Sequence, residues 1–271
     1  MEIIENFLYQ IIFTVGVIAI FGLLIALCRR TFCRILGNTG AKIILVTGAV
    51  GTPIHELSHA LMCIIFGHKI VGIKLYQPNS DDGTLGYVNH TFNPKNPYHQ
   101  IGNFFIGIAP ILCGSGVLLL LMYLLVPGVY SGVMSELQFA ALLSTDFFDI
   151  STYEGYFDLF LGIVSEIFGF TNTGNVFWWI FIVLALMISS HMELSTADIK
   201  GGAKGFAMIA VLLLAFDIVM YLVSFSTLES VTEAMVSFSS VIAGFLAVSA
   251  VFSGIMILIA LAIKGISKIK K

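Results

Sequence analysis

The sequence predicts an all-α polytopic membrane protein with about six transmembrane helices and a small β-hairpin between the second and the third. Of the 271 residues, 58% are hydrophobic and only 11% are charged, whereas a soluble domain carries about 25% charged residues. The net charge of −3 comes without a basic tract, which does not favour a nucleic-acid-binding protein. We therefore expect one integral membrane domain over residues 1–271, with a core over about residues 42–226.

Six apolar runs are the candidate membrane spans. A helix that crosses the bilayer needs about 20 mostly apolar residues. Five of the runs reach or approach this length, and the fourth is shorter. The runs cover residues 7–27, 43–67, 104–126, 177–189, 206–225 and 241–263.

Residues 68–102, between the second and third runs, predict a β-hairpin loop. Val71, Ile73 and Leu75 alternate with smaller or polar residues, and a turn rich in Pro, Asn, Asp and Gly follows at residues 78–83. Short alternating runs around such a turn are typical of a hairpin. Because non-helical backbone is tolerated at membrane depth only where protein covers it or water reaches it, we expect the hairpin at the surface or beside a polar site.

Residues 127–176 predict an external acidic loop. The segment contains no Lys or Arg, and its acidic residues are interleaved with aromatic residues. This pattern favours a partly helical segment that lies on the membrane. Its carboxylates are expected to face water rather than to bind a metal ion.

The segment around the letters HELSH carries the clearest chemical signal. His55 and His59 are four residues apart, so on a helix they share one face and can bind one metal ion, usually Zn²⁺. Glu56 points to the side of that pair, where it can act as a general base rather than as a ligand. It is the only charged residue between Lys42 and Lys69. Since a charge in a span costs roughly 2.5–3.5 kcal/mol on insertion scales, a metal site is favoured over a structural polar cluster.

A catalytic zinc site with two His ligands needs a third protein ligand and leaves one position for water. The segment SSHMELSTADIKGG, residues 189–202, offers Glu193 and Asp198. Asp198 also suits the first turn of a helix capped by Ser195, and this structural role does not exclude metal binding. His191 is expected either to orient a ligand or to lie at the membrane interface.

The four cysteines are not expected to form a metal site. None of Cys28, Cys33, Cys63 and Cys113 belongs to a CxxC pair, and the last two lie inside apolar runs. Thiols in such positions usually behave as small apolar side chains. Packing is therefore the role that the sequence predicts for them.

Three segments resemble, in chain order, the site-2 protease family of intramembrane zinc metalloproteases. They are HELSHALMCIIFGHKIVGIKL, IGIAPILCGSG and LSTADIKGG, and the resemblance covers roughly residues 46–207. The family usually has Gly directly after the Asp and Pro before it, whereas here Ile199 and Lys200 precede Gly201. No PDZ or CBS regulatory domain accompanies the segments, so the chain would be a minimal or divergent member.

The resemblance implies a zinc-dependent endopeptidase that hydrolyses a peptide bond in or near a transmembrane segment of a substrate protein. It assigns Zn²⁺ to His55, His59 and Asp198, and it assigns the role of general base to Glu56. The free edge of the hairpin would bind the unwound substrate strand by β-augmentation. The expected partners are a transmembrane protein substrate and the lipid bilayer, and no nucleic acid.

Two other functions stay open from the sequence. A CaaX-type membrane zinc protease would use HExxH with a downstream glutamate, here Glu193, as a ligand. A non-proteolytic metal-binding membrane protein or a transporter is the other alternative, because intramembrane His and acidic residues also mark ion pathways. The inverted repeat of many transporters is not visible, since no second HELSH-like spacing occurs in the chain.

The distribution of Lys and Arg predicts a cell-membrane orientation with the active site toward the cytoplasmic side. If all six runs cross and the N-terminus is cytoplasmic, nine lysines lie inside, among them Lys69 and Lys264, and four basic residues lie outside. The positive-inside rule prefers this arrangement. The basic cluster at residues 29–34 opposes it, because such a cluster just after a first span is normally cytoplasmic.

Overall fold

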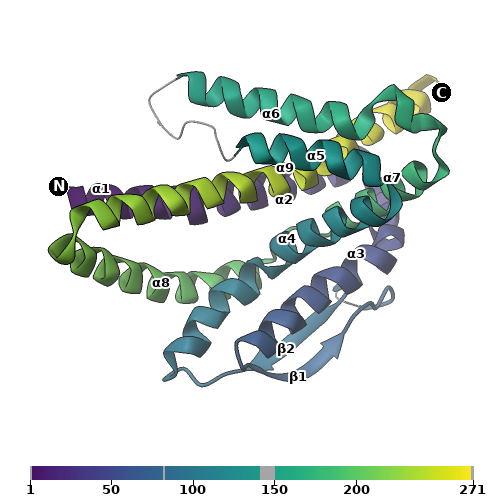
Figure 1. The fold of residues 1–271 in the computed structure, drawn as a ribbon. Coiled ribbons are helices and arrows are strands. Elements are labelled where there is room, and N and C mark those ends of the chain that lie inside the picture. The colour runs from purple at the N-terminus through teal and green to yellow at the C-terminus, as the bar shows by residue number, and fades with distance from the viewer. Residues whose placement is uncertain (1, 82, 141–149, 270–271) are drawn as a thin grey trace.

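The computed structural model describes residues 2–81, 83–140 and 150–269, and helices dominate these ranges (Figure 1). A π-helical stretch, Ile12–Gly16, joins the first two helices, and a 3₁₀ turn, Phe170–Gly174, precedes α7. The helices are α1 (Glu2–Ile11), α2 (Val17–Leu36), α3 (Asn38–Ile65), α4 (Pro97–Leu125), α5 (Pro127–Ala140), α6 (Ile150–Phe168), α7 (Val176–Ser189), α8 (Thr196–Val223) and α9 (Phe225–Ile269). The strands are β1 (Lys69–Lys74) and β2 (Tyr87–Thr91).

Four helical segments of the described chain are long and apolar enough to cross a membrane. They are Ile3–Leu36, Pro97–Leu125, Thr196–Val223 and Phe225–Ile266. The second predicted span, α3, has 28 residues, but its His, Glu, Thr and Pro residues make it more polar than these four. The fourth predicted span, α7, has only 14 residues, or about 21 Å of helix. The helical class, with four candidate membrane-spanning helices among the described residues, is confirmed, and the number of six crossings stays a prediction.

The hairpin is confirmed as a two-stranded antiparallel sheet. Ile70 pairs with His90 and Lys74 pairs with Tyr87, and a bulge between Ile70 and Gly72 interrupts the ladder. The sheet lies along α3 (Figure 1). The Tyr76 hydroxyl donates a 2.5 Å hydrogen bond to the Leu45 carbonyl, which places the turn of the hairpin beside the first half of α3.

Helices α7 and α8 lie end to end along α4 and run antiparallel to it. Close contacts place Met192 against Gly114, Gly202 against Gly107 and Gly205 against Phe104. Gly205 already meets Gln100 and Phe104 near the start of α4, so only the first turns of α8 follow that helix. The separate crossings predicted for the runs in α7 and α8 stay a prediction. The non-helical link between them, residues 190–195, lies beside the middle of α4. If α4 spans a bilayer, non-helical backbone at this level has to be covered by protein or reached by water.

The packing of α9 shows which basic residues lie near Lys264. Ser115 of α4 and Ser249 of α9 share a 2.8 Å hydrogen bond. Further along α9, Met256 and Ala260 pack with Phe32 and Ile44, at the end of α2 and the start of α3. The C-terminal part of α9 therefore lies on the side of Arg34 and Lys42. Lys69 follows the other end of α3, about 42 Å of helix away, so the packing does not favour the grouping of Lys264 with Lys69.

The predicted external loop is largely a helical hairpin, α5 and α6, in its described part. Val133 and Leu137 of α5 and Ile163 and Ile167 of α6 are almost fully buried in the largest apolar cluster. Helices α5 and α6 lie next to α9, on the side away from α3 and the sheet (Figure 1). This segment thus contributes to the core rather than only covering it. Residues 141–149 of the predicted loop lie outside the described residues.

Candidate metal centre

The structure brings together the three residues that the sequence analysis named as metal ligands. One ligand atom of each of His55, His59 and Asp198 lies within 4.8 Å of the other two. The Nε2 atoms of the two imidazoles are 3.1 Å apart, and Asp198 Oδ1 lies 3.3 Å from His59 Nε2. Side-chain exposure is 8% for His59 and 14% for Asp198. One turn of α3 and the first turn of α8 thus form a compact group of two ring nitrogens and a carboxylate.

Backbone carbonyl groups fix the orientation of both imidazoles. His55 Nδ1 lies 2.7 Å from the His191 carbonyl oxygen, and His59 Nδ1 lies 2.8 Å from the Ile106 carbonyl oxygen. Because a carbonyl can only accept, each Nδ1 carries the hydrogen, and a neutral ring therefore presents an Nε2 lone pair. Two lone pairs 3.1 Å apart repel each other unless a cation or a proton lies between them. The donor set and its carbonyl partners fit a metal ion such as Zn²⁺.

Asp198 caps the start of α8 and also lies close to His59. Its backbone N–H donates to Ser195 Oγ at 3.1 Å, and its Oδ2 accepts from the Ser195 backbone N–H at 2.7 Å. This reciprocal capping box starts α8. It leaves Oδ1 directed toward His59. Oδ2 therefore caps the helix, whereas Oδ1 faces His59. The cap holds the carboxylate in this orientation.

A glycine of α4 allows Asp198 to come this close. A Cβ built on Gly107 would lie 2.6 Å from the Asp198 carbonyl oxygen and 3.1 Å from the Gly202 Cα. Real side-chain atoms do not approach backbone atoms so closely. The small residues of the third predicted span thus permit the contact between α4 and the first turn of α8, as expected for close helix packing in membranes.

We expect Gly107→Ala to move α8 away from α4 and to weaken zinc binding by at least tenfold. Overpacking of this kind usually costs about 1–3 kcal/mol. Gly116→Ala in the same helix is the matched control, because a Cβ there meets nothing within 4 Å. Competition with a zinc chelator measures the affinity. Equal zinc affinity in the two variants would mean that this helix contact does not position Asp198.

Glu56 is buried beside the cluster and faces a cavity. Only 6% of the residue is exposed. The cavity has a volume of about 350 Å³ and is lined by Glu56, His55, Thr52 and residues 83–86 of the hairpin, among others. Thr52 Oγ1 is buried and has no hydrogen-bond partner among the described residues. The carboxylate thus faces a space that can hold water and part of a substrate.

The hairpin closes over Glu56. A Cβ built on Gly86 would lie 2.8 Å from Glu56 Cγ, 2.8 Å from Thr52 Cγ2 and 2.9 Å from the Lys74 carbonyl oxygen. Position 86 therefore accommodates only glycine without displacement of its neighbours. A second, almost wholly apolar cavity of about 310 Å³ reaches Asp198 between α2, α4 and α8. The ligand cluster thus lies between a polar space on the Glu56 side and an apolar space on the Asp198 side.

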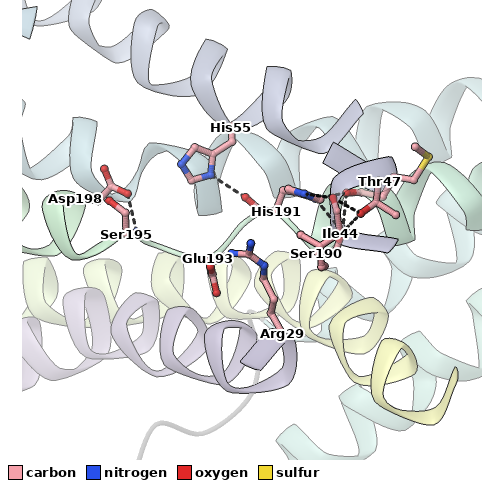
Figure 2. A network of polar contacts seen from close by, with 10 residues as sticks. Arg29, Ile44, Thr47, His55, Ser190, His191, Glu193, Ser195 and Asp198 are labelled. Atoms are coloured by element: carbon pink, nitrogen blue, oxygen red, sulfur yellow. Dashed lines mark hydrogen bonds and ion pairs between the residues drawn. The ribbon is translucent and has the colours of Figure 1, made fainter. Parts of the chain in front are cut away.

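Glu193 and His191 do not join the ligand cluster. Figure 2 shows Glu193 directed toward Arg29 of α2, with which it forms an ion pair. The His191 ring turns away from His55, and its Nε2 lies 3.1 Å from the Ile44 carbonyl oxygen. It is the backbone carbonyl of His191, not its ring, that orients His55. Both residues therefore support the link between α7 and α8.

Several groups at the site were not predicted from the sequence. Arg29 was treated as a topology signal, and the carbonyl groups of Ile106 and His191 leave no trace in a residue pattern. Gly51 was not singled out either, although a Cβ there would lie 2.3 Å from the Met187 carbonyl oxygen. The position of Gly51 four residues before His55, on the same helix face, is a signal that could have found it.

Comparisons of this chain with protein-family models, with curated proteins and with solved structures find no significant match.

Proposed function

We propose that the chain is a zinc-dependent intramembrane endopeptidase and a minimal or divergent member of the site-2 protease family. The observation that carries the proposal is the meeting of His55, His59 and Asp198 in one buried cluster, with Glu56 at a neighbouring cavity. The cluster lies among helices that are apolar enough to cross a membrane. Such a site would reach a peptide bond in the membrane-spanning segment of a substrate protein.

His55, His59 and Asp198 would hold Zn²⁺, which supplies Lewis acidity to a water molecule and to the substrate carbonyl. Glu56 accepts a proton from the attacking water and later donates it to the nitrogen of the departing amine. The carbonyl groups of His191 and Ile106 keep the two imidazoles in the required tautomer. The ion pair between Arg29 and Glu193 holds the non-helical link against α2.

The hairpin supports the choice of an extended peptide as substrate. Among the described residues, β1 and β2 pair only with each other, so each has a free edge. An edge strand binds an unwound peptide through backbone hydrogen bonds. Residues 83–86, which lead into β2, line the same cavity as Glu56. A substrate strand that adds to the hairpin would therefore enter beside the general base.

The packing also supports a cell-membrane orientation in which the Glu56 cavity opens toward the cytoplasm. Leu85, one of the residues that line this cavity, packs with the end of α2 and the start of α3. Arg34, Lys42 and Lys264 lie on this side. By the positive-inside rule it faces the cytoplasm, which also accounts for the basic cluster after the first span. In this arrangement the N-terminus lies outside, and α3 and the α7–α8 pair cross along with the other long helices.

Cysteine labelling in intact cells tests the orientation. Lys42→Cys should react with a membrane-impermeant maleimide only after the cells are opened, whereas Lys95→Cys should react in intact cells. The unsubstituted protein gives the background from the four natural cysteines. The reverse labelling pattern would place the cavity on the outer face.

The activity is tested with purified, zinc-loaded protein in detergent and a panel of single-span peptides that carry a fluorophore and a quencher. Mass spectrometry of the products locates the cleaved bond. Cleavage within or next to the apolar segment, abolished by a zinc chelator and restored by Zn²⁺, is the expected result. Zinc binding without cleavage of any peptide, together with zinc flux into vesicles, would favour the transporter alternative instead.

A further inference from the structure

A second cluster of metal-binding side chains lies where α3 ends and the hairpin begins. One ligand atom of each of Cys63, His68 and His90 lies within 4.8 Å of the other two. Cys63 is fully buried, and His68 is only 5% exposed. The cluster shares no residue with the His55–His59–Asp198 group. The proposed peptidase mechanism gives it no task, so its presence needs a separate explanation.

The turn after α3 creates the cluster. Gly67 has a φ of 69°, a left-handed conformation that suits glycine and ends the helix. The chain then reverses, and the His68 backbone N–H donates a 2.8 Å hydrogen bond to the Cys63 carbonyl. His68 therefore returns to the last turn of α3 beside Cys63. The third member, His90, comes from β2, where it pairs with Ile70.

Hydrogen bonding leaves one nitrogen of His68 free to bind a metal. Its Nε2 donates to the His99 carbonyl at 2.8 Å, so the hydrogen of the neutral ring lies there and Nδ1 presents a lone pair. That Nδ1 lies 3.0 Å from His90 Nδ1. Two imidazole nitrogens bound to one tetrahedral Zn²⁺ are roughly 3.4 Å apart, from Zn–N bonds of about 2.0–2.1 Å. Phe92 fixes the plane of the His68 ring by stacking, with centroids 4.9 Å apart.

The donor types favour a metal as well. One thiol and two imidazoles are a donor set that suits Zn²⁺.

We propose that Cys63, His68 and His90 bind a second Zn²⁺ ion, which ties β2 to the end of α3. The thiol binds as the thiolate and releases its proton to water when the ion enters. The three ligands come from the helix, the turn and the second strand, so the ion links these three elements. Three protein ligands leave the fourth position for water. The ion would hold the hairpin in place beside the peptidase site.

Zinc analysis and X-ray absorption of the purified full chain test the proposal. The wild type should hold two zinc ions per chain, and Cys63→Ala and His90→Ala should each hold one. In Asp198→Ala only the second site remains loaded, so its spectrum should show a sulfur ligand at about 2.3 Å. His55→Ala gives the same test if Asp198→Ala does not fold. Cys113→Ala is the matched control, because Cys113 is a half-buried thiol outside the cluster, and it should keep both ions.

Either of two outcomes would overturn the second site. One is a wild type that binds a single zinc ion without sulfur scattering when zinc is in excess. The other is a zinc content that Cys63→Ala leaves unchanged. Neither outcome affects the first site, since zinc bound to nitrogen and oxygen alone would still support the peptidase. A zinc content that Asp198→Ala leaves unchanged, with sulfur scattering in the wild type, would instead count against the peptidase site only.

Discussion

Glu56→Gln is expected to slow peptide hydrolysis by roughly 10²–10⁴-fold, the usual contribution of a general acid–base group. The amide has almost the same shape as the carboxylate, but it cannot accept a proton from water. Glu56 follows His55 in α3 and lines the adjacent cavity, yet it is not part of the ligand cluster. The zinc content should therefore not change. Initial rates with the fluorogenic peptides, measured beside zinc analysis of the same sample, give both values.

Glu154→Gln in α6 is the matched control, because Glu154 is exposed and far from the site in sequence. It should leave rate and zinc content unchanged. A Glu56→Gln protein that cleaves at the wild-type rate would remove Glu56 from the mechanism. A protein that loses its zinc would show that Glu56 acts as a ligand, contrary to the arrangement described here.

Asp198→Asn is expected to lower the zinc affinity strongly. Loss of a residue that only hydrogen-bonds to a metal ligand costs roughly 10–100-fold in affinity, and loss of a direct ligand should cost more. The amide oxygen can still accept the Ser195 backbone N–H, so the cap of α8 is retained. The charged oxygen that faces His59 at 3.3 Å is lost. Two imidazoles alone should then hold zinc too weakly for hydrolysis. Chelator competition measures the affinity, and rescue of the rate at high zinc concentration would confirm the cause.

Glu193→Gln separates the two protease hypotheses. Glu193 pairs with Arg29 rather than with the imidazoles, so this variant should keep its zinc affinity and most of its activity. A loss of zinc in Glu193→Gln, with none in Asp198→Asn, would favour the CaaX-type alternative. The pair of variants thus decides which acidic residue completes the ligand set.

The grouping of His55, His59 and Asp198 was predictable because its signals are local. The four-residue spacing of His55 and His59 follows from helix geometry, and the position of Asp198 in a capped first turn follows from the Ser195 pattern. That these two segments meet depends on α4, whose Gly107 permits the contact. A sequence pattern gives the small residue but not the partner that packs against it.

The path of the chain was less predictable. Each apolar run was treated as one crossing, whereas α7 and the first turns of α8 both follow α4. The segment with α5 and α6, predicted as an external loop, packs into the core. Acidic composition alone favoured an external loop, because composition does not reveal which face of a helix is buried. Cys63, His68 and His90 were also missed, since their ligand spacing is set by a helix-ending turn and a strand pairing rather than by a short motif.

Anomalous diffraction at the zinc absorption edge, from crystals of the purified chain, shows directly which side chains bind the zinc ion. We expect a peak bonded to His55 Nε2, His59 Nε2 and Asp198 Oδ1, at the roughly 2.0–2.2 Å typical of zinc with nitrogen and oxygen ligands. A zinc peak bonded to Glu193 would contradict this ligand set. Bound zinc without a peak at the two imidazoles would contradict it as well.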